Sequence, residues 1–407
     1  MYSHQKKSTA HGSSTKNASS KAKIRDDYQN RFIDVISRFV TPIQLRQPTD
    51  SSSRFVVCAR VRPFLESERL RSDVYPCVTT TNDTVSVHAG NLRLNRLEMK
   101  SMTFQLDAVF GRYATNENVY HVVRQTILQS FPNVDVIPID SVIFLYGKTG
   151  SGKSHTIVGI GEHFAHDIFH WINRSRCNVR IGISAIEIVA GTKGFIVSKD
   201  NVCDLYNNGA LVCFREDADG RVHLRGAKEY PCENSAELDG YIKAAMALRR
   251  TQATVRNPVS SRSHFIYSVH IRNAASTFDE GEIISTITFV DLAGNEGQQD
   301  SLYHQGNSDT VRDSTSINRS LSALQDCIRA AATQSKVIPF RGSVLTRILK
   351  KSFCSGNTKT VFIGTISELP MDAEQSIQTL KYAGLIKWPL EEFIAEKTIR
   401  LNDNTQS

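Results

Sequence analysis

Strand-like and helix-like hydrophobic patterns alternate along most of the chain. The strand-like segments are 142–145, 180–189, 264–272 and 282–290, and the helical segments are 235–250 and 313–332. Short apolar runs between turn residues indicate buried strands, whereas apolar residues three and four positions apart indicate helices with one buried face. Because the two kinds alternate, we predict an α/β fold with a central, mostly parallel, twisted sheet and helices on both faces.

The first fifty residues have a different pattern. Residues 1–25 contain six Lys or Arg and no acidic residue, so we expect a basic disordered tail. Such a tail is either solvated or an electrostatic tether to an acidic polymer. Over residues 28–40, six apolar side chains recur at helical spacing, and Pro42 and Pro48 then interrupt the chain. Residues 26–53 are therefore predicted to form a neck-like amphipathic helix, packed on the main domain, and a linker.

The composition narrows the class of protein. The chain has no run of 18 apolar residues, so we expect no membrane span. Its 8 cysteines form no CxxC pair and no Cys/His metal spacing, which favours the reduced thiols of an intracellular protein. The formal net charge of +8 suits an acidic polymer as the partner.

A glycine-rich motif follows the apolar run 142–145. The pattern Gly147-x4-Gly152-Lys153-Ser154 is a complete P-loop in the strand–turn–helix context that the motif requires. Its glycines let backbone N–H groups surround phosphate oxygens, Lys153 supplies a positive charge, and the Ser154 hydroxyl is a ligand for Mg²⁺. The alternative is a chance glycine loop. The motif by itself predicts binding of a nucleoside triphosphate.

Two later segments indicate the kind of nucleotide site. The first is Asn257-Pro-Val-Ser-Ser-Arg-Ser-His264, and the second is Asp291-Leu-Ala-Gly-Asn-Glu296. An Asp that ends a hydrophobic strand is the usual second acidic element of a P-loop site, close to the Mg²⁺ shell. Gly294 offers a backbone N–H that can approach a γ-phosphate closely.

Together these three segments resemble the nucleotide site of the kinesin motor domain, whose two switch patterns are matched at every specified position. Similar matches continue from about residue 54 to about residue 388. The resemblance implies a P-loop NTPase of the kinesin motor fold over 54–390, followed by a short C-terminal tail over 391–407. It also implies ATP and Mg²⁺ as cofactors, tubulin in microtubules as the partner, and a place in the cytoplasm on the microtubule cytoskeleton, in a spindle or a flagellum. Nucleic acid is not expected as a partner.

The resemblance assigns roles to individual residues. It implies that Ser260 and Ser261 close over the γ-phosphate and that Arg262 forms a charge pair with Glu296, with Gly294 completing the catalytic set. The implied Mg²⁺ set is Ser154, Ser261 and Asp291. The implied nucleotide contacts are Arg60, Arg62, Pro63, Gly147, Lys148, Thr149, Gly150, Ser151, Gly152, Lys153, Ser154, His155 and Asn257. The implied microtubule contacts are Arg93, Arg341, Arg347, Lys350 and Lys351. For His264, a core role and a phosphate contact remain alternatives.

Three features are similar to the internal-motor kinesins that depolymerise microtubules. They are Asn295 in the second switch, the run Leu324-Gln-Asp-Cys-Ile-Arg-Ala330, and the basic segment and helix before the motor. Because 18 residues (407 minus 389) follow Pro389 in this sequence, we expect no homodimerising coiled coil within it.

Other positions depart from the family pattern. The stretch Leu92–Asn95 lacks the Lys-Val-Asp tip of the depolymerising class, Lys148 stands where Gln is usual, and Glu368 stands where Pro is usual. Gly297 and Val344 also depart from it. We therefore predict an ATP-driven depolymerase or end regulator. The alternatives are a monomeric or partner-dependent kinesin that binds or moves along the lattice, and a non-catalytic microtubule-binding protein.

Overall fold

The computed structural model describes most of the chain. The described residues are 12–39, 54–93, 96–132, 137–175, 177–189, 201–216, 222–256, 262–274, 281–295, 308–387 and 394–401. Among these residues, no helix is both long and apolar enough to cross a bilayer.

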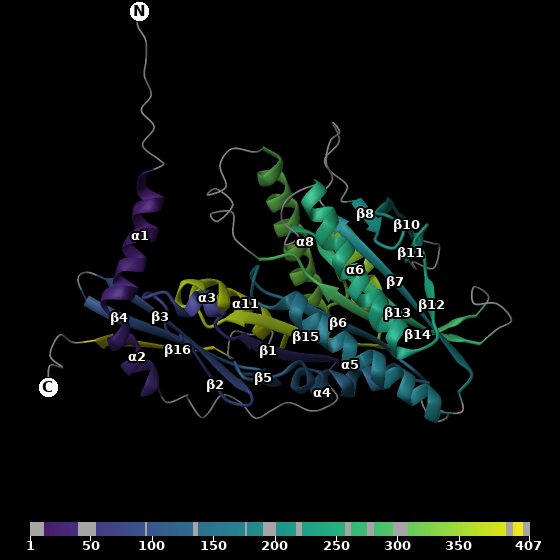
Figure 1. The fold of residues 1–407 in the computed structure, drawn as a ribbon, viewed down its shortest axis with the longest axis horizontal. Helices are drawn as coiled ribbons and strands as arrows, with labels where there is room; N and C mark the ends of the chain where they lie inside the picture. Colours follow the sequence, from purple (N-terminus) through teal and green to yellow (C-terminus); the bar gives the residue numbers. More distant parts are fainter. Residues whose placement is uncertain are drawn as a thin grey trace, which may run out of the picture.

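A ten-stranded mixed sheet forms the centre of the molecule (Figure 1). In spatial order its strands are β5 (Ala108–Phe110), β1 (Phe55–Arg62), β15 (Thr358–Ser367), β6 (Asp140–Tyr146), β14 (Ile283–Asp291), β13 (His264–Asn273), β7 (Val179–Val189), β8 (Asn201–Asp204) and β9 (Ala210–Leu211), and β12 (Tyr230–Cys232) also pairs with β7. The strands from β5 to β14 pair in parallel. The predicted strands over 142–145, 180–189, 264–272 and 282–290 are all confirmed.

The sheet is less parallel than predicted. All pairings beyond β14 are antiparallel, namely β14–β13, β13–β7, β7–β8, β8–β9 and β7–β12. The reason lies in the connections, because only residues 274–282 separate β13 from β14, and so short a connection permits only antiparallel pairing.

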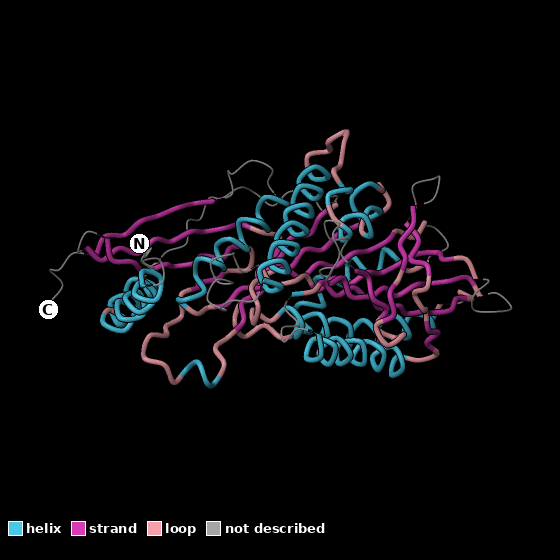
Figure 2. The backbone as a smooth tube through the Cα atoms, turned by 90° about the horizontal axis from the view of Figure 1, so that it is seen from above, coloured by secondary structure: helices cyan, strands magenta, loops and turns pink. Residues whose placement is uncertain are grey.

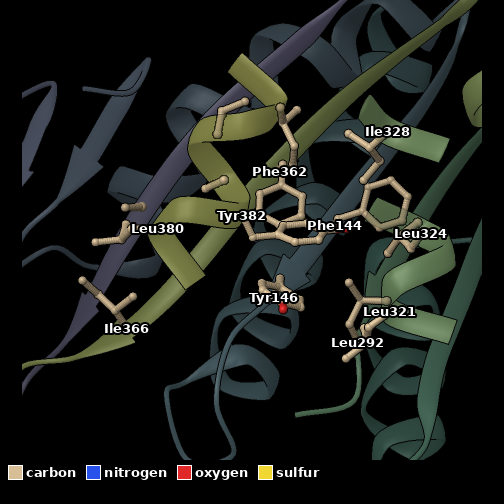
Figure 3. Packing of buried hydrophobic residues seen from close by; sticks show 14 of the residues in the cluster. Phe144, Tyr146, Leu292, Leu321, Leu324, Ile328, Phe362, Ile366, Leu380 and Tyr382 are labelled. Carbon is tan, nitrogen blue, oxygen red and sulfur yellow. The ribbon is translucent and has the colours of Figure 1, made fainter. Parts of the chain in front are cut away.

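Helices cover both faces of this sheet, as predicted (Figure 2). One face carries α4 (Asn116–Ile127), α5 (Lys153–Arg174) and α6 (Ser235–Arg256), and the other carries α8 (Ser308–Ala332), α9 (Val344–Ile348), α10 (Lys350–Cys354) and α11 (Ala373–Lys387). Strand β6 is buried on both sides, and its residues alternate between the two hydrophobic clusters. Figure 3 shows part of one cluster, in which Tyr146 of β6 stacks with Tyr382 of α11, with ring centroids 4.4 Å apart, and also contacts Phe362 of β15 at 5.9 Å.

A second sheet of four strands lies at one end of the molecule (Figure 1). Its spatial order is β16 (Ile394–Leu401), β4 (Arg96–Gln105), β3 (Thr84–Arg93) and β2 (Val78–Thr80), and we call it the small sheet. Within the predicted C-terminal tail over 391–407, Ile394–Leu401 forms β16, a strand that the sequence did not reveal, which pairs antiparallel with β4 along its whole length. Backbone hydrogen bonds to an existing strand edge order this segment, although its side chains are mostly exposed.

The N-terminal segment lies against the small sheet. Helix α2 (Gln29–Ser37) buries Phe32 and Ile36, which confirms the predicted amphipathic helix. The tail predicted to be disordered over 1–25 instead contains most of a helix, α1 (Gly12–Asp27). Two ion pairs fix the C-terminal half of this polar helix to the body, Lys21 with Glu374 at 3.0 Å and Arg25 with Asp73 at 3.3 Å. Residues 1–11 lie outside the described part.

Shorter elements complete the chain. They are α3 (Glu66–Arg69), the hairpin of β10 (Cys213–Glu216) and β11 (Val222–Arg225), and the 3-10 turns Leu128–Ser130, Phe340–Gly342 and Pro370–Asp372.

Candidate nucleotide site

The P-loop lies at the C-terminal end of β6 and leads directly into α5. Gly152 has a φ of 99° and is the residue before the first helical turn, a conformation that glycine adopts without strain. A Cβ on Gly147 would lie 2.1 Å from the carbonyl oxygen of Thr365 on the neighbouring strand. The loop therefore needs glycine at both positions, and it places the N-terminus of α5 where an anion would bind.

Lys153 lies inside the curl of this loop. Its Nζ donates to the carbonyl oxygens of Gly147 at 2.7 Å and Lys148 at 3.0 Å, and the residue is 7% exposed. The positive charge expected at the phosphates is thus held where the loop encloses it.

Asp291 and Ser154 meet as the two motifs predict. Ser154 Oγ donates to Asp291 Oδ2 at 2.7 Å, although the two residues are 137 positions apart. Asp291 is 1% exposed, and its other oxygen, Oδ1, is buried without a hydrogen-bond partner in the described part of the chain. Mg²⁺ takes oxygen ligands and keeps several waters, so an unsatisfied buried carboxylate oxygen beside a serine hydroxyl fits this ion.

Arg249 is a residue of this site that the sequence motifs did not reveal. From α6, its Nη1 donates to Asp291 Oδ2 at 2.6 Å and its Nη2 donates to the Ser263 carbonyl oxygen at 2.8 Å. The guanidinium is 4% exposed and lies 3.8 Å from Glu187 of β7. Arg249 therefore links the acidic end of β14 to the start of β13, the strand that follows the first switch motif.

His264 is a core residue rather than a phosphate contact. Its Nδ1 accepts from the backbone N–H of Ala293 at 3.1 Å, and its Nε2 lies 2.7 Å from Ser320 Oγ. Complete burial, with Arg249 nearby, lowers the pKa of His264 to about 3. The ring is neutral at physiological pH and connects β13, the segment after β14, and α8.

Four of the implied nucleotide contacts, Arg60, Arg62, Pro63 and His155, are the residues through which the resemblance implies an adenine base, and they lie at different depths. Arg60 is buried, and its guanidinium donates to Asn116 Oδ1 at 2.6 Å and Thr156 Oγ1 at 2.8 Å. Burial lowers the pKa of Arg60. Arg62 is half-buried and pairs with Glu68 at 2.8 Å, whereas Pro63 and His155 are exposed. Of these four residues, Pro63 and His155 therefore present the most open surface to a base.

Lys148, the unusual P-loop residue, does not extend over the loop. Its Nζ lies 2.6 Å from Asp372 Oδ1, in the turn before α11. Ser151 is buried, with its Oγ 2.7 Å from Thr365 Oγ1, and Thr149 and Gly150 are exposed.

The switch segments are only partly described. Asn257, Ser260, Ser261, Glu296 and Gly297 lie outside the described residues, so the pair of Arg262 with Glu296 remains a prediction. Arg262 itself is half-buried and Gly294 is buried.

The predicted microtubule contacts fall in two places. Three are beside the β10–β11 hairpin: Arg341 stacks on Phe340 at 5.3 Å, Arg347 lies 4.4 Å from the ring centroid of Phe214, and Lys350 pairs with Glu216 at 2.6 Å. Close to them in the chain, Lys351 pairs with Asp140 at 2.5 Å. Arg93 is exposed at the end of β3 on the small sheet and is not part of this group. Val344, where the family usually has a lysine, is the first residue of α9 and is buried.

Comparisons with known proteins point to one family. The family model described as "Kinesin motor domain" matches residues 60–388. The chain is 32% identical over 342 residues to "Diatom spindle kinesin-1" of Cylindrotheca fusiformis, covering 83% of this chain and 51% of that protein. It is 31% identical over 357 residues to "Kinesin-like protein KIF24" of Mus musculus, covering 86% of this chain and 25% of the relative. It is 29% identical over 347 residues to "Kinesin-like protein KIN-13B" of Arabidopsis thaliana, covering 84% of this chain and 48% of the relative.

The chain thus spans between a quarter and about half of the length of these relatives. Among solved structures it is similar to "Structure of a fast kinesin: Implications for ATPase mechanism and interactions with microtubules". That match has a TM-score of 0.66 and 26% identity, and covers 83% of this chain and 93% of the other.

Proposed function

The chain belongs to the kinesin motor-domain family, and from this premise we propose that it is a microtubule-stimulated ATPase that depolymerises microtubules or regulates their ends. Kinesin motor domains in general bind ATP with Mg²⁺ and bind microtubules. The observation that carries the catalytic part of the proposal is the contact of Ser154 with the buried Asp291, whose second oxygen has no partner in the described part of the chain.

The residues divide the work of phosphoryl transfer to water, which depends on positioning and charge stabilisation. The P-loop and the N-terminus of α5 bind the phosphates, and Lys153 places its charge beside the loop carbonyls. Ser154 and Asp291 would hold Mg²⁺, which when bound supplies charge neutralisation to the phosphate oxygens. Arg249 orients the Asp291 carboxylate through its 2.6 Å contact.

The switch residues complete the proposal. Ser260 and Ser261 close over the γ-phosphate, and the pair of Arg262 with Glu296 orders the attacking water. Removing one partner of a buried ion pair costs about 3–5 kcal/mol, which is enough to prevent closure. Glu296→Ala should therefore retain ATP binding and lose most hydrolysis. Turnover equal to that of the unchanged protein would exclude Glu296 from the mechanism.

The action at microtubule ends is supported by sequence and by structure. Asn295 and the run 324–330 resemble the internal-motor class. In the structure, the ring of Phe32 in α2 occupies the position that a Cβ on Gly90 of β3 would need, at 2.6 Å. The neck-like helix and the hairpin of β3 and β4 are therefore one packed unit, and a helix held this way can transmit load to the tip of the hairpin.

One observation favours the alternative of a kinesin that binds or moves along the lattice. The tip of the β3–β4 hairpin carries Arg93 and Arg96, both exposed, and the sequence between them has no acidic residue. A basic tip is attracted to the acidic surface of tubulin, whereas the tip of the depolymerising class carries an acidic residue. The basic tip therefore favours binding to the lattice. The intact P-loop and Asp291 argue against a non-catalytic protein.

Microscopy separates the two functions. Stabilised fluorescent microtubules are mixed with the protein and ATP, with Glu296→Ala as the control. Shortening from the ends that requires ATP and fails with Glu296→Ala supports the depolymerase. Intact filaments with bound or moving protein support the lattice alternative. Either result fits a location on microtubules, and one relative is named as a spindle kinesin.

A further inference from the structure

The connection between β15 and α11 lies at the centre of the nucleotide site. β15 pairs in parallel with β1 on one side and with β6 on the other. The C-terminal ends of all three strands meet at one edge of the sheet, which is where ligands bind in α/β folds. β1 leads to Arg62 and Pro63 on the base side, and β6 leads to the P-loop on the phosphate side. The residues after β15 therefore lie between the two walls of the site.

This connection contacts the phosphate wall through polar side chains. Asp372 Oδ1 accepts from Lys148 Nζ at 2.6 Å, across 224 positions of sequence. At the end of β15, Thr365 Oγ1 lies 2.7 Å from Ser151 Oγ. Asp372 is 8% exposed, so the charge of Lys148 is held by a buried partner.

The same connection contacts the base wall. Glu368 Oε1 accepts from the backbone N–H of Phe64 at 3.0 Å, one residue after Pro63. Its Oε2 lies 2.9 Å from Arg112 Nη1. Arg62 Nη2 donates to Ser367 Oγ at 3.3 Å. Glu368 is 1% exposed, and burial raises its pKa.

A buried carboxylate in a short connection is unfavourable unless its partners compensate for the lost hydration. Here one connection of five residues, 368–372, contains two such carboxylates. Each is directed to a different wall of the same crevice. Apolar side chains could fill this part of the core without either carboxylate. A defined spacing between two ligand-binding segments, however, requires directional contacts such as hydrogen bonds and ion pairs.

We propose that Glu368 and Asp372 are positioning residues for a nucleoside triphosphate, and that they fix the P-loop relative to the base-flanking segment Arg62–Phe64. The inference rests on the proposed nucleotide-binding function. Asp372 acts on the phosphates through Lys148. Glu368 acts on the base through the backbone of Phe64. The two residues therefore affect different parts of the same ligand.

The Asp372 contact is tested with a pair of neutral substitutions. Lys148→Gln and Asp372→Asn each leave one unpaired charge and should weaken binding of fluorescently labelled ADP with Mg²⁺ about tenfold. The double variant restores a neutral amide pair and should bind within about threefold of the unchanged protein. If the loss of affinity in the double variant equals the product of the two single losses, the two residues act independently, and the role of this contact is overturned.

The Glu368 contact is tested with a ligand that has no base. Glu368→Ala should raise the KM for ATP about tenfold with kcat within about twofold, and should leave competition by Mg²⁺-tripolyphosphate unchanged. Glu368→Gln keeps an acceptor for Phe64 and should recover most of the affinity. Lys148→Gln should instead weaken tripolyphosphate as well. Equal losses for both ligands in Glu368→Ala would overturn the assignment to the base side.

Two controls separate the possible failures. Glu374, two residues after Asp372, has a side chain that is 71% exposed. The variant Glu374→Gln should therefore bind nucleotide normally. The melting temperature of Glu368→Gln is also measured without nucleotide. If its loss of nucleotide affinity follows the fall in this melting temperature, the residue is merely structural and the inference fails. If the unchanged protein binds labelled ADP but hydrolyses no ATP, the proposed function fails, and the binding measurements still decide the roles of Glu368 and Asp372.

Discussion

The nucleotide site and the small sheet are held together by different interactions. In the site, charged side chains meet directly, as in the buried pair of Arg249 with Asp291 and the partly buried pair of Lys148 with Asp372. In the small sheet and the helix on it, large apolar side chains pack together: Phe32 stacks on Tyr75 with ring centroids 5.6 Å apart. The ion pair of Lys100 with Glu396 on that sheet is about half exposed at both ends.

This difference separates function from assembly. A buried ion pair fixes geometry to fractions of an ångström but tolerates little change, because removing one partner leaves an uncompensated charge. Apolar packing is less directional, and its loss scales with the volume removed. Substitutions in the site should therefore affect turnover first. Substitutions in the small sheet should release the N-terminal helices and leave hydrolysis intact.

The largest effect is expected at Arg249. Arg249→Ala leaves Asp291 buried without its cation and should destabilise the fold by about 3–5 kcal/mol and lower ATP turnover at least 100-fold. Urea unfolding and steady-state ATPase measure the two effects. Arg249→Lys keeps the charge and should fold, with turnover about tenfold lower. Lys243→Ala, in an exposed pair on the same helix, should match the unchanged protein, and normal turnover in Arg249→Ala would refute the role given to this residue.

The next largest effect is expected at Phe32. Phe32→Ala removes a fully buried ring and should weaken the docking of α2 by about 3–5 kcal/mol. Hydrogen exchange of α1 and α2 should then accelerate, while ATP turnover stays within about twofold. Ile33→Ala, at a site that is 38% exposed on the same helix, is the matched control. A fall in turnover as large as that of Arg249→Ala would remove the distinction between the two regions.

A smaller effect concerns pH and His88 of β3. Burial lowers the pKa of His88 to about 4, with its ring nitrogens near Ser101 Oγ at 2.8 Å and Thr79 Oγ1 at 3.0 Å. The unfolded histidine, with a pKa near 6.5, binds a proton that the folded one does not, so stability falls as pH drops from about 6.5 towards 4. At pH 5 this amounts to about 2 kcal/mol.

Replacement of the ring tests this dependence. The free energy of unfolding is measured with urea at pH 7 and at pH 5. Between these two pH values, His88→Gln should lose about 2 kcal/mol less of this free energy than the unchanged protein. His121→Gln, at an exposed site on α4, should follow the unchanged protein. Identical pH dependence of His88→Gln and the unchanged protein would show that His88 is not buried as a neutral ring.

The smallest effect is expected at Arg341, an exposed basic residue beside the β10–β11 hairpin. This residue belongs neither to the nucleotide site nor to the small sheet. Exposed ionic contacts contribute up to about 1 kcal/mol each and are screened by salt. Arg341→Ala should therefore weaken microtubule co-sedimentation about fivefold, more at low salt than at high salt, without changing the melting temperature. An unchanged affinity at low salt would place the microtubule contact elsewhere.

The sequence predicted what is local in the chain. β6, the P-loop and Asp291 lie in short motifs, and α2 follows from six apolar positions, so each was found without knowing its neighbours. Arg249 and Asp372 lie in no motif, and Glu368 was noted only as a departure from the family pattern. Their side chains contact residues that are 14 to 304 positions away. β16 was missed for a similar reason, because its order comes from the edge of β4 rather than from its own exposed side chains. The contact of Lys148 with Asp372 was not foreseen, because the two residues are 224 positions apart in the sequence.

The most direct test of this account is ATP turnover with and without microtubules, measured for the unchanged protein, Asp291→Asn and Phe32→Ala. The account predicts that microtubules raise the ATP turnover of the unchanged protein. It also predicts that turnover is at least 100-fold lower in Asp291→Asn and within about twofold of the unchanged protein in Phe32→Ala. Turnover that survives in Asp291→Asn, or that microtubules do not raise in the unchanged protein, would contradict it.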